Sequence, residues 1–428
     1  MKAKRTILVV SIFIVSVLIY SCGESKKEQY KKLVKPHKEV LKESSHYTYY
    51  LPKDSSQIQS VFLIMDPHSQ PNHVMDSLHE YADNNNLALL GLTEIKNGIS
   101  NYQTIVKRDL GHFMRYKKLS KVKVFAMGFS GAARMALLYA NKNRIDGLII
   151  VGAGTNRQNQ LPFPTALIAG TRDFNFLEQY YSPKNPKSFE RNLIAIHYRG
   201  EHQWPPINIL EDAMDFVINK GNIKSDLLAE NFEAKSKEYL QNKNYYLAVK
   251  AMEAAYKLSI NDSLEIRRKR FTKLIAQRKV KYYYLKLDKY ISEEYERFGE
   301  MSNYLLHNDI QWWINQINYY DSKAASKRNL ISADSYARTK AYLGILIYSR
   351  LNAAISGRGQ FALIPKYLKI YEIIAPKNPD YFFFKGVYAY TQSSESDAIK
   401  YIKQAKEYGF TDDIKINKFF PREFVEKL

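Results

Sequence analysis

The serine at position 130 lies in a setting that suits nucleophilic chemistry. Residues 122–127 are mostly apolar or β-branched and predict a buried strand, and a segment rich in glycine and alanine follows directly. A sharp turn from a strand into a helix strains the serine at its apex and needs very small neighbours, because strand and helix then pass close together. Gly128, Gly131 and Ala132 supply such neighbours. We expect Ser130 at the start of a helix, where the N–H of Gly131 can stabilise a developing oxyanion.

An acid and a histidine follow this serine, each just beyond a predicted strand. Asp173 comes after the apolar run 166–169, and His202 lies in the loop after the run 193–198. A serine nucleophile needs a base that takes its proton, and that base needs a carboxylate that orients it. The sequence therefore offers a candidate triad of Ser130, His202 and Asp173.

Each of these residues also has a purely structural interpretation. Ser130 could cap the helix that follows it. Asp173 lies in a segment that also suits a turn. His197 falls inside a predicted strand, so we interpret it as a packed strand residue and not as the base.

Two regions of different pattern surround these residues. Residues 45–222 alternate short apolar runs with helix-like stretches, a pattern typical of an α/β domain whose mostly parallel sheet is covered on both faces. From about residue 225 the strand signal disappears and helical periodicity takes over, which predicts an all-α domain over residues 223–428.

The turn at Ser130 and the order serine, aspartate, histidine at strand ends together resemble the α/β-hydrolase superfamily, and its serine esterases in particular. The resemblance covers roughly residues 45–220. It implies that Ser130 attacks an acyl carbonyl to form an acyl-enzyme, that His202 is the general base and then the acid, and that Asp173 supports the imidazolium. It also implies carboxylic esters as substrates and no cofactor. The sequence has no spacing of His, Asp and Glu that is typical of metal ligands, so we expect no metal ion. The sequence departs from the family pattern at Ala132, where glycine is usual.

The resemblance also implies a second oxyanion donor from the loop after the predicted strand 61–65. The backbone N–H of His68 or Ser69 would fill that role, although the family usually has glycine at position 69. Only residues 152–164 separate two predicted strands where many relatives insert a lid, so we expect no cap domain. Ser130 then faces an open cleft or is covered by the helical region.

Two parts of the helical region share one spacing of small and large residues. Small residues fall where paired antiparallel helices would cross, which resembles the tetratricopeptide repeat and implies a possible protein partner. The two sets are Phe232, Ser236, Tyr239, Ala248, Met252 and Ala255, and Phe382, Gly386, Ala389, Ala398, Ile402 and Ala405.

The N-terminus has the features of an export signal. Positive residues begin the chain, residues 7–18 are almost wholly apolar, and the only cysteine follows at position 22. This arrangement resembles the lipobox of bacterial lipoproteins, which implies a signal peptide over residues 1–21, lipidation of Cys22 and a polar tether over residues 22–44. We expect a cell-envelope protein held by lipid at the outer membrane. The alternative is an uncleaved N-terminal anchor with an incidental cysteine.

The charge and cysteine content of the chain exclude several kinds of function. Lys and Arg number 64 against 43 Asp and Glu, a net charge of +21 that is spread along the chain and does not form a basic tail. We expect no nucleic-acid partner. A single cysteine excludes an intramolecular disulfide and a cysteine-cluster metal site. The competing hypothesis is a hydrolase-like scaffold without activity, or a binding module that acts through the repeats. Ala132 and the lack of glycine at position 69 favour this alternative, and the complete triad opposes it.

Overall fold

The computed structural model describes residues 42–43, 46–155, 161–180, 192–220 and 224–428. The predicted signal peptide, Cys22 and residues 22–41 of the predicted tether lie outside this part of the chain. None of the described helices combines the length and the hydrophobicity that a bilayer span requires.

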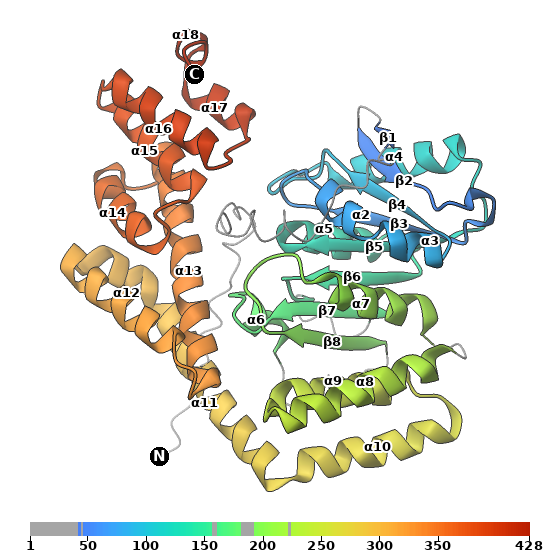
Figure 1. Cartoon of the computed structure of the whole chain (residues 1–428). Coiled ribbons are helices and arrows are strands. Elements are labelled where there is room, and N and C mark those ends of the chain that lie inside the picture. Colours follow the sequence, from blue (N-terminus) through green and yellow to red (C-terminus); the bar gives the residue numbers. More distant parts are fainter. Residues whose placement is uncertain (1–41, 44–45, 156–160, 181–191, 221–223) are drawn as a thin grey trace, which may run out of the picture.

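Within the described residues, eight strands form one sheet in the order β1-β2-β4-β3-β5-β6-β7-β8 (Figure 1). Strands β4, β3, β5, β6, β7 and β8 run parallel, and β1 and β2 pair antiparallel at one edge. The sheet starts earlier than predicted, since β1 lies within the expected tether. The strands are β1 Lys42–Glu43, β2 Tyr47–Tyr50, β3 Ser60–Met65, β4 Leu87–Leu92, β5 Lys123–Phe129, β6 Gly147–Val151, β7 Thr165–Gly170 and β8 Leu193–Tyr198.

Helices cover both faces of this sheet, as near-continuous apolar strands require. Alternate residues of β3 enter different cores: Phe62 and Ile64 pack with α2, α3 and α7, whereas Val61 and Leu63 pack with α4 and α5. The predicted mostly parallel α/β sheet is confirmed. The helices are α2 Asn72–Ser77, α3 His79–Asn84, α4 Tyr102–Tyr116, α5 Ser130–Ala140, α6 Phe176–Gln179 and α7 Ile207–Asn219, and the 3₁₀ turn η1 spans Ser55–Gln57.

The second region is helical, as predicted. In Figure 1 the helices α8 and α9 lie beside β8, α10 and α11 lead away from them, and α12 to α18 stand beside the sheet domain. They are α8 Lys224–Gln241, α9 Tyr245–Leu258, α10 Asn261–Ala276, α11 Arg278–His307, α12 Ile310–Ala324, α13 Leu330–Ile355, η3 Phe361–Leu363, α14 Ile364–Ile374, α15 Pro379–Thr391, α16 Glu395–Glu407, α17 Asp413–Phe419 and α18 Arg422–Val425.

Small residues lie at both predicted helix crossings. The hydroxyl of Ser236 donates to the carbonyl of Ala248 at 2.7 Å across the pair α8 and α9. A Cβ on Gly386 would lie 3.3 Å from the carbonyl oxygen of Ala398 and only 2.7 Å from Ile402 Cδ1, so α15 and α16 also approach closely. The tetratricopeptide assignment stays a prediction.

The sheet and the first helices of the second region share one hydrophobic core. Ile194 and Ile196 of β8 belong to the same cluster as Phe232 of α8 and Leu247 of α9. The ammonium of the buried Lys257 donates to the carbonyl of Leu193 at 2.7 Å. Helix α9 therefore covers the edge strand and satisfies a polar group there. The predicted boundary at residues 222–223 falls outside the described residues and does not divide two cores.

Replacing Lys257 by alanine tests this attachment of α9 to the sheet. Lys257 pairs with the buried Glu253 at 2.8 Å and donates to the carbonyl of Leu193. Glu253 keeps Lys250 at 3.1 Å, so the loss of Lys257 chiefly leaves the carbonyl of Leu193 without this donor. We expect the free energy of unfolding to fall by about 1–3 kcal/mol in chemical denaturation. The control Lys269→Ala removes an exposed lysine and should change it by less than about 0.5 kcal/mol. Equal effects of the two variants would contradict this account of the interface.

Candidate active site

Ser130 occupies a strained turn between β5 and α5. Its φ angle is 54°, in the left-handed region that a residue with a side chain rarely adopts. A Cβ on Gly128 would lie 2.7 Å from the carbonyl oxygen of Ala132 and 2.8 Å from Ala133 Cα. Glycine is therefore required at position 128, and the close passage of strand and helix expected from the sequence is present.

Three side chains from different loops form one chain of hydrogen bonds. The Nε2 atom of His202 lies 2.8 Å from the hydroxyl of Ser130, and its Nδ1 atom lies 2.8 Å from Oδ1 of Asp173. Ser130 starts α5 at the end of β5, while Asp173 and His202 follow β7 and β8. Parallel strands end at the same edge of a sheet, which is why residues so distant in sequence meet. The structure thus brings together all three predicted triad residues.

The partners of His202 fix its tautomer. An ionised Asp173 only accepts hydrogen bonds, so Nδ1 of His202 carries the proton that it donates. In the neutral ring Nε2 is then the acceptor for the hydroxyl of Ser130. Asp173 is itself held, because its Oδ1 also accepts from the backbone N–H of Asn175 at 2.8 Å. Asn175 in turn donates its side-chain amide to the carbonyl of Gly152 at 2.7 Å.

Packing confines the imidazole of His202 as tightly as the hydrogen bonds do. The ring centroids of Phe129 and Phe174 lie 4.7 Å and 4.4 Å from that of His202. Gly152 approaches from another side with a φ of +61°; a Cβ there would lie 3.0 Å from His202 Cε1 and 3.1 Å from Asp173 Oδ2. His202 is only 4% exposed, so the ring has little room to turn away from its partners.

His197 takes the structural role that its place in a strand suggested. It is buried in β8 and lies 2.6 Å from the hydroxyl of Tyr246 and 3.0 Å from Oε1 of Gln179. Burial, with the charge of Lys250, lowers the pKa of His197 well below its ordinary value. The contact of His197 with Tyr246 supports the interface with α9.

The loop after β3 is held by the buried Asp66. Its Oδ1 accepts the backbone N–H of His68 at 2.8 Å, its carbonyl accepts that of Ser69 at 3.2 Å, and its Oδ2 accepts the indole N–H of Trp204 at 2.8 Å. Burial alone would raise the pKa of Asp66, but the hydrogen bonds and charge of His68, with the bond from Trp204, bring it below its usual value.

This loop therefore gives no support to the predicted second oxyanion donor. The N–H groups of His68 and Ser69 both point to Asp66 and not towards a substrate oxygen. Gly131 differs, since it is the second residue of α5 and its N–H has no acceptor within the helix by position. Its assignment as the first donor stays a prediction that the geometry allows.

The helical region is hydrogen-bonded to the loop that carries Asp173. The hydroxyl of Thr171 donates to Oδ2 of Asp334 on α13 at 2.7 Å. The guanidinium of Arg338, also on α13, donates to the carbonyl of Thr171 and is paired at 2.7 Å with Glu294 of α11. Phe174, which packs on His202, also clusters with Ile345 of α13. These contacts join residues that are far apart in the chain, so no local sequence pattern predicts them.

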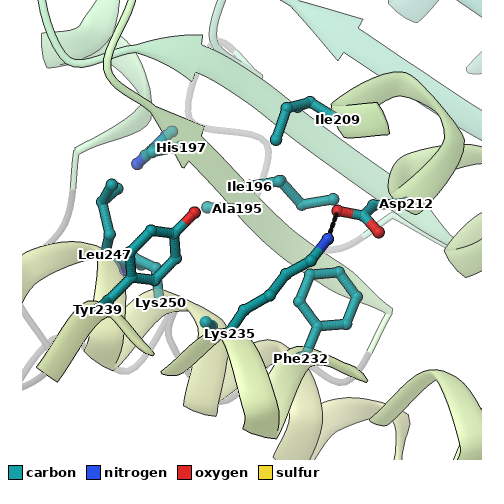
Figure 2. Close-up of a pocket in the computed structure, with 11 residues that line it drawn as sticks. Ala195, Ile196, His197, Ile209, Asp212, Phe232, Lys235, Tyr239, Leu247 and Lys250 are labelled. Carbon is teal, nitrogen blue, oxygen red and sulfur yellow. Dashed lines mark hydrogen bonds and ion pairs between the residues drawn. The ribbon is translucent and has the colours of Figure 1, made fainter. Parts of the chain in front are cut away.

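A small pocket beside the sheet lies away from the triad. Figure 2 shows it between β8, α7, α8 and α9, with the ion pair of Lys235 and Asp212 at its side. Its volume is about 20 Å³, which is room for roughly one water molecule. It is a gap in packing and too small for an ester substrate. Among the described residues, no three His, Cys, Asp or Glu side chains gather as metal ligands would.

Known proteins resemble this chain only distantly. No protein-family model and no curated protein sequence matches this chain. Solved structures that resemble it include Est1E from Butyrivibrio proteoclasticus, at 13% identity over 39% of this chain and 90% of that one, with a TM-score of 0.29. XC6422 from Xanthomonas campestris, described as an α/β serine hydrolase without a lid, matches at 15% identity over 41% and 89%, with a TM-score of 0.31. The third is an α/β serine hydrolase homologue from Coxiella burnetii, at 17% over 40% and 90%, with a TM-score of 0.28.

The described part of residues 46–220 is a mostly parallel α/β sheet with helices on both faces, and a helical region follows it. Such low identities and scores carry no conclusion about activity. The chemistry has to be inferred from the geometry of Ser130, His202 and Asp173.

Replacing Gly152 by alanine tests the packing that confines His202. The added methyl would press on the imidazole and on Asp173, so we expect kcat for an ester to fall by about 10²-fold while the protein stays folded. Gly357→Ala is the matched control, because Gly357 also has a positive φ of +71° but nothing within 4 Å of a Cβ. If both variants kept full activity, the close packing at Gly152 would not matter for catalysis.

Replacing Asp334 tests whether α13 positions the catalytic loop. Asp334→Ala removes the acceptor of Thr171, and we expect kcat to fall by about tenfold because small displacements of catalytic groups are costly. Asp334→Asn keeps an acceptor and should retain more activity. Glu296→Ala removes an exposed acid of α11 and should have no effect. The measurement is kcat of all three variants in steady-state kinetics. An unchanged kcat in Asp334→Ala would show that this contact with the helical region does not contribute to catalysis.

Proposed function

We propose that this protein is a serine hydrolase that cleaves carboxylic esters through an acyl-enzyme on Ser130. The observation that carries the proposal is the continuous hydrogen-bonded chain from Ser130 through His202 to Asp173, at the carboxyl edge of an α/β-hydrolase sheet. Its order in the sequence and its position on strand ends are those of a nucleophile, an acid and a base.

Acylation follows from this geometry. As the hydroxyl oxygen of Ser130 attacks the ester carbonyl, Nε2 of His202 takes its proton, and Asp173 stabilises the imidazolium that forms. The carbonyl oxygen becomes an oxyanion beside the N–H of Gly131 and the positive end of α5. When the tetrahedral intermediate collapses, His202 gives the proton to the leaving alkoxide, and the alcohol departs.

Deacylation repeats the same steps with water. His202 takes a proton from a water molecule as its oxygen attacks the acyl carbonyl, and then returns that proton to the oxygen of Ser130. The products are the carboxylic acid and free enzyme. The same triad also cleaves thioesters and peptides, and the preference for oxygen esters rests on the family resemblance.

The envelope location is a proposal from the sequence. The apolar segment before Cys22 supports export and lipid attachment at that cysteine, with the outer membrane as the favoured site. The helical region, which is bonded to the loop of Asp173, is proposed to limit the size of substrates and to bind a protein partner through its helix pairs.

A catalytically inactive scaffold is the second candidate. Full burial of Ser130, at 0% exposure, and the engagement of the His68 and Ser69 N–H groups by Asp66 favour it. The strained φ of Ser130 opposes it, since such strain typically persists where it serves function.

Hydrolysis of a panel of short to long acyl esters separates the two candidates. We expect the wild-type protein to cleave at least one of them and Ser130→Ala to lose at least about 10³-fold in kcat, because no other group replaces the nucleophile. The control Ser77→Ala removes a hydroxyl that bonds the carbonyl of His73 within α2 and should leave kcat unchanged. A folded wild-type protein that cleaves none of the esters would favour the scaffold.

A further inference from the structure

The first half of α11 carries apolar side chains on two opposite faces. Its buried stripe, which packs into the protein, consists of Val280, Tyr284, Leu287 and Ile291. A second stripe has the same spacing but is shifted by two residues, about 200° around the helix, and so faces away from the core. This exposed stripe consists of Arg278, Tyr282, Leu285 and Lys289. Tyr282 is 68% exposed and Leu285 is 64% exposed.

Basic side chains surround this exposed stripe. Residues 273–289 contain six Lys or Arg and one acid, Asp288, which accepts a hydrogen bond from the hydroxyl of Tyr180. Lys289 lies 3.8 Å from Glu293, and the other five cations make no ion pair within the described residues. The five, all exposed, are Lys273, Arg278, Lys279, Lys281 and Lys286. Clustered cations without partners create a positive potential that attracts anions.

The charge on this face of α11 changes sign further along the helix. Glu293, Glu296 and Glu300 continue the line of the exposed stripe, and no basic residue lies between them on that line. An anionic surface therefore attracts the first half of the helix and repels the second. Figure 1 shows that the first half begins at the corner between α10 and α11, at one end of the molecule.

Cations beside exposed apolar side chains match the boundary of an anionic bilayer. Phosphate groups lie there directly above hydrocarbon, so Lys and Arg can contact phosphates while a tyrosine and a leucine enter the layer below. An acidic protein would offer charge, but it would not by itself explain the apolar residues at the centre of the stripe. The predicted lipid attachment at Cys22 would also keep a bilayer within reach of the chain.

We propose that α11 docks on the surface of an anionic phospholipid bilayer through residues 278–289. Tyr282 and Leu285 enter the headgroup layer, and the surrounding Lys and Arg side chains bind lipid phosphates. The helix lies on the bilayer and does not cross it, and its acidic second half points away from the lipid. This inference does not rest on the proposed ester hydrolysis.

Tryptophan fluorescence can report contact between the stripe and the lipid. The full chain with Leu285→Trp would be mixed with vesicles of dibrominated phosphatidylglycerol or dibrominated phosphatidylcholine, because bromine quenches only a tryptophan close to the acyl chains. We expect more quenching than in the wild type with phosphatidylglycerol and no such excess with phosphatidylcholine. Leu306→Trp is the matched control, since Leu306 is also exposed on α11 but lies about 32 Å further along the helix. It should show no excess quenching.

Removing charge from the stripe tests the role of its cations. Lys279→Gln, Lys281→Gln and Lys286→Gln would be combined in the chain with Leu285→Trp. Each cation at an anionic surface typically strengthens binding about fivefold, so the ratio of docked to undocked protein should fall on the order of 10²-fold. A matched control removes three exposed lysines elsewhere and should keep its quenching. Its substitutions are Lys107→Gln, Lys142→Gln and Lys403→Gln.

Three results would overturn this inference, provided that the circular dichroism spectra of the variants match that of the wild type. The first is an unquenched Leu285→Trp protein with phosphatidylglycerol vesicles, which is also the result expected if the stripe binds only an acidic protein. The second is equal quenching by the two lipids. The third is quenching that persists after the three lysines of the stripe are replaced.

Discussion

The imidazole of His202 joins two hydrogen bonds of 2.8 Å, and the rest of the site is arranged around that ring. A proton can pass between Ser130 and His202 only while the ring keeps one orientation. Asp173 fixes that orientation by accepting from Nδ1, and Phe129 and Phe174 restrict it by contact. Ser130 adopts a strained left-handed φ, and in this conformation its hydroxyl bonds to His202.

The helical region belongs to this arrangement. Helix α13 bonds to Thr171 through Asp334 and Arg338, and it packs Ile345 against Phe174, which itself contacts His202. Along the edge of the sheet, α9 covers β8 and bonds to it through Lys257. A partner that moved α13 would therefore act on the loop of Asp173 directly, which gives the two parts of the chain one physical connection.

Features carried by local patterns could be predicted from the sequence. Apolar runs indicated the strands, tiny residues indicated the turn at Ser130, and strand ends indicated Asp173 and His202, which the structure brings together. The engagement of His68 and Ser69 by Asp66 could not be foreseen, because it depends on how one loop folds on itself. Other features depend on contacts between segments far apart in the sequence, which local spacing does not predict. They are the pairing of β1, the contact of Asn97 with Gly131 and the hydrogen bonds of α13 to Thr171.

Covalent labelling tests the central claim most directly, because only an activated serine reacts with a fluorophosphonate. The folded protein would be incubated with the probe, and the mass of the intact protein and of its peptides would locate the adduct. The account predicts one adduct per molecule, on the peptide that contains Ser130, and none after denaturation before labelling. A folded protein that gains no adduct, or gains it on another residue, would contradict the account.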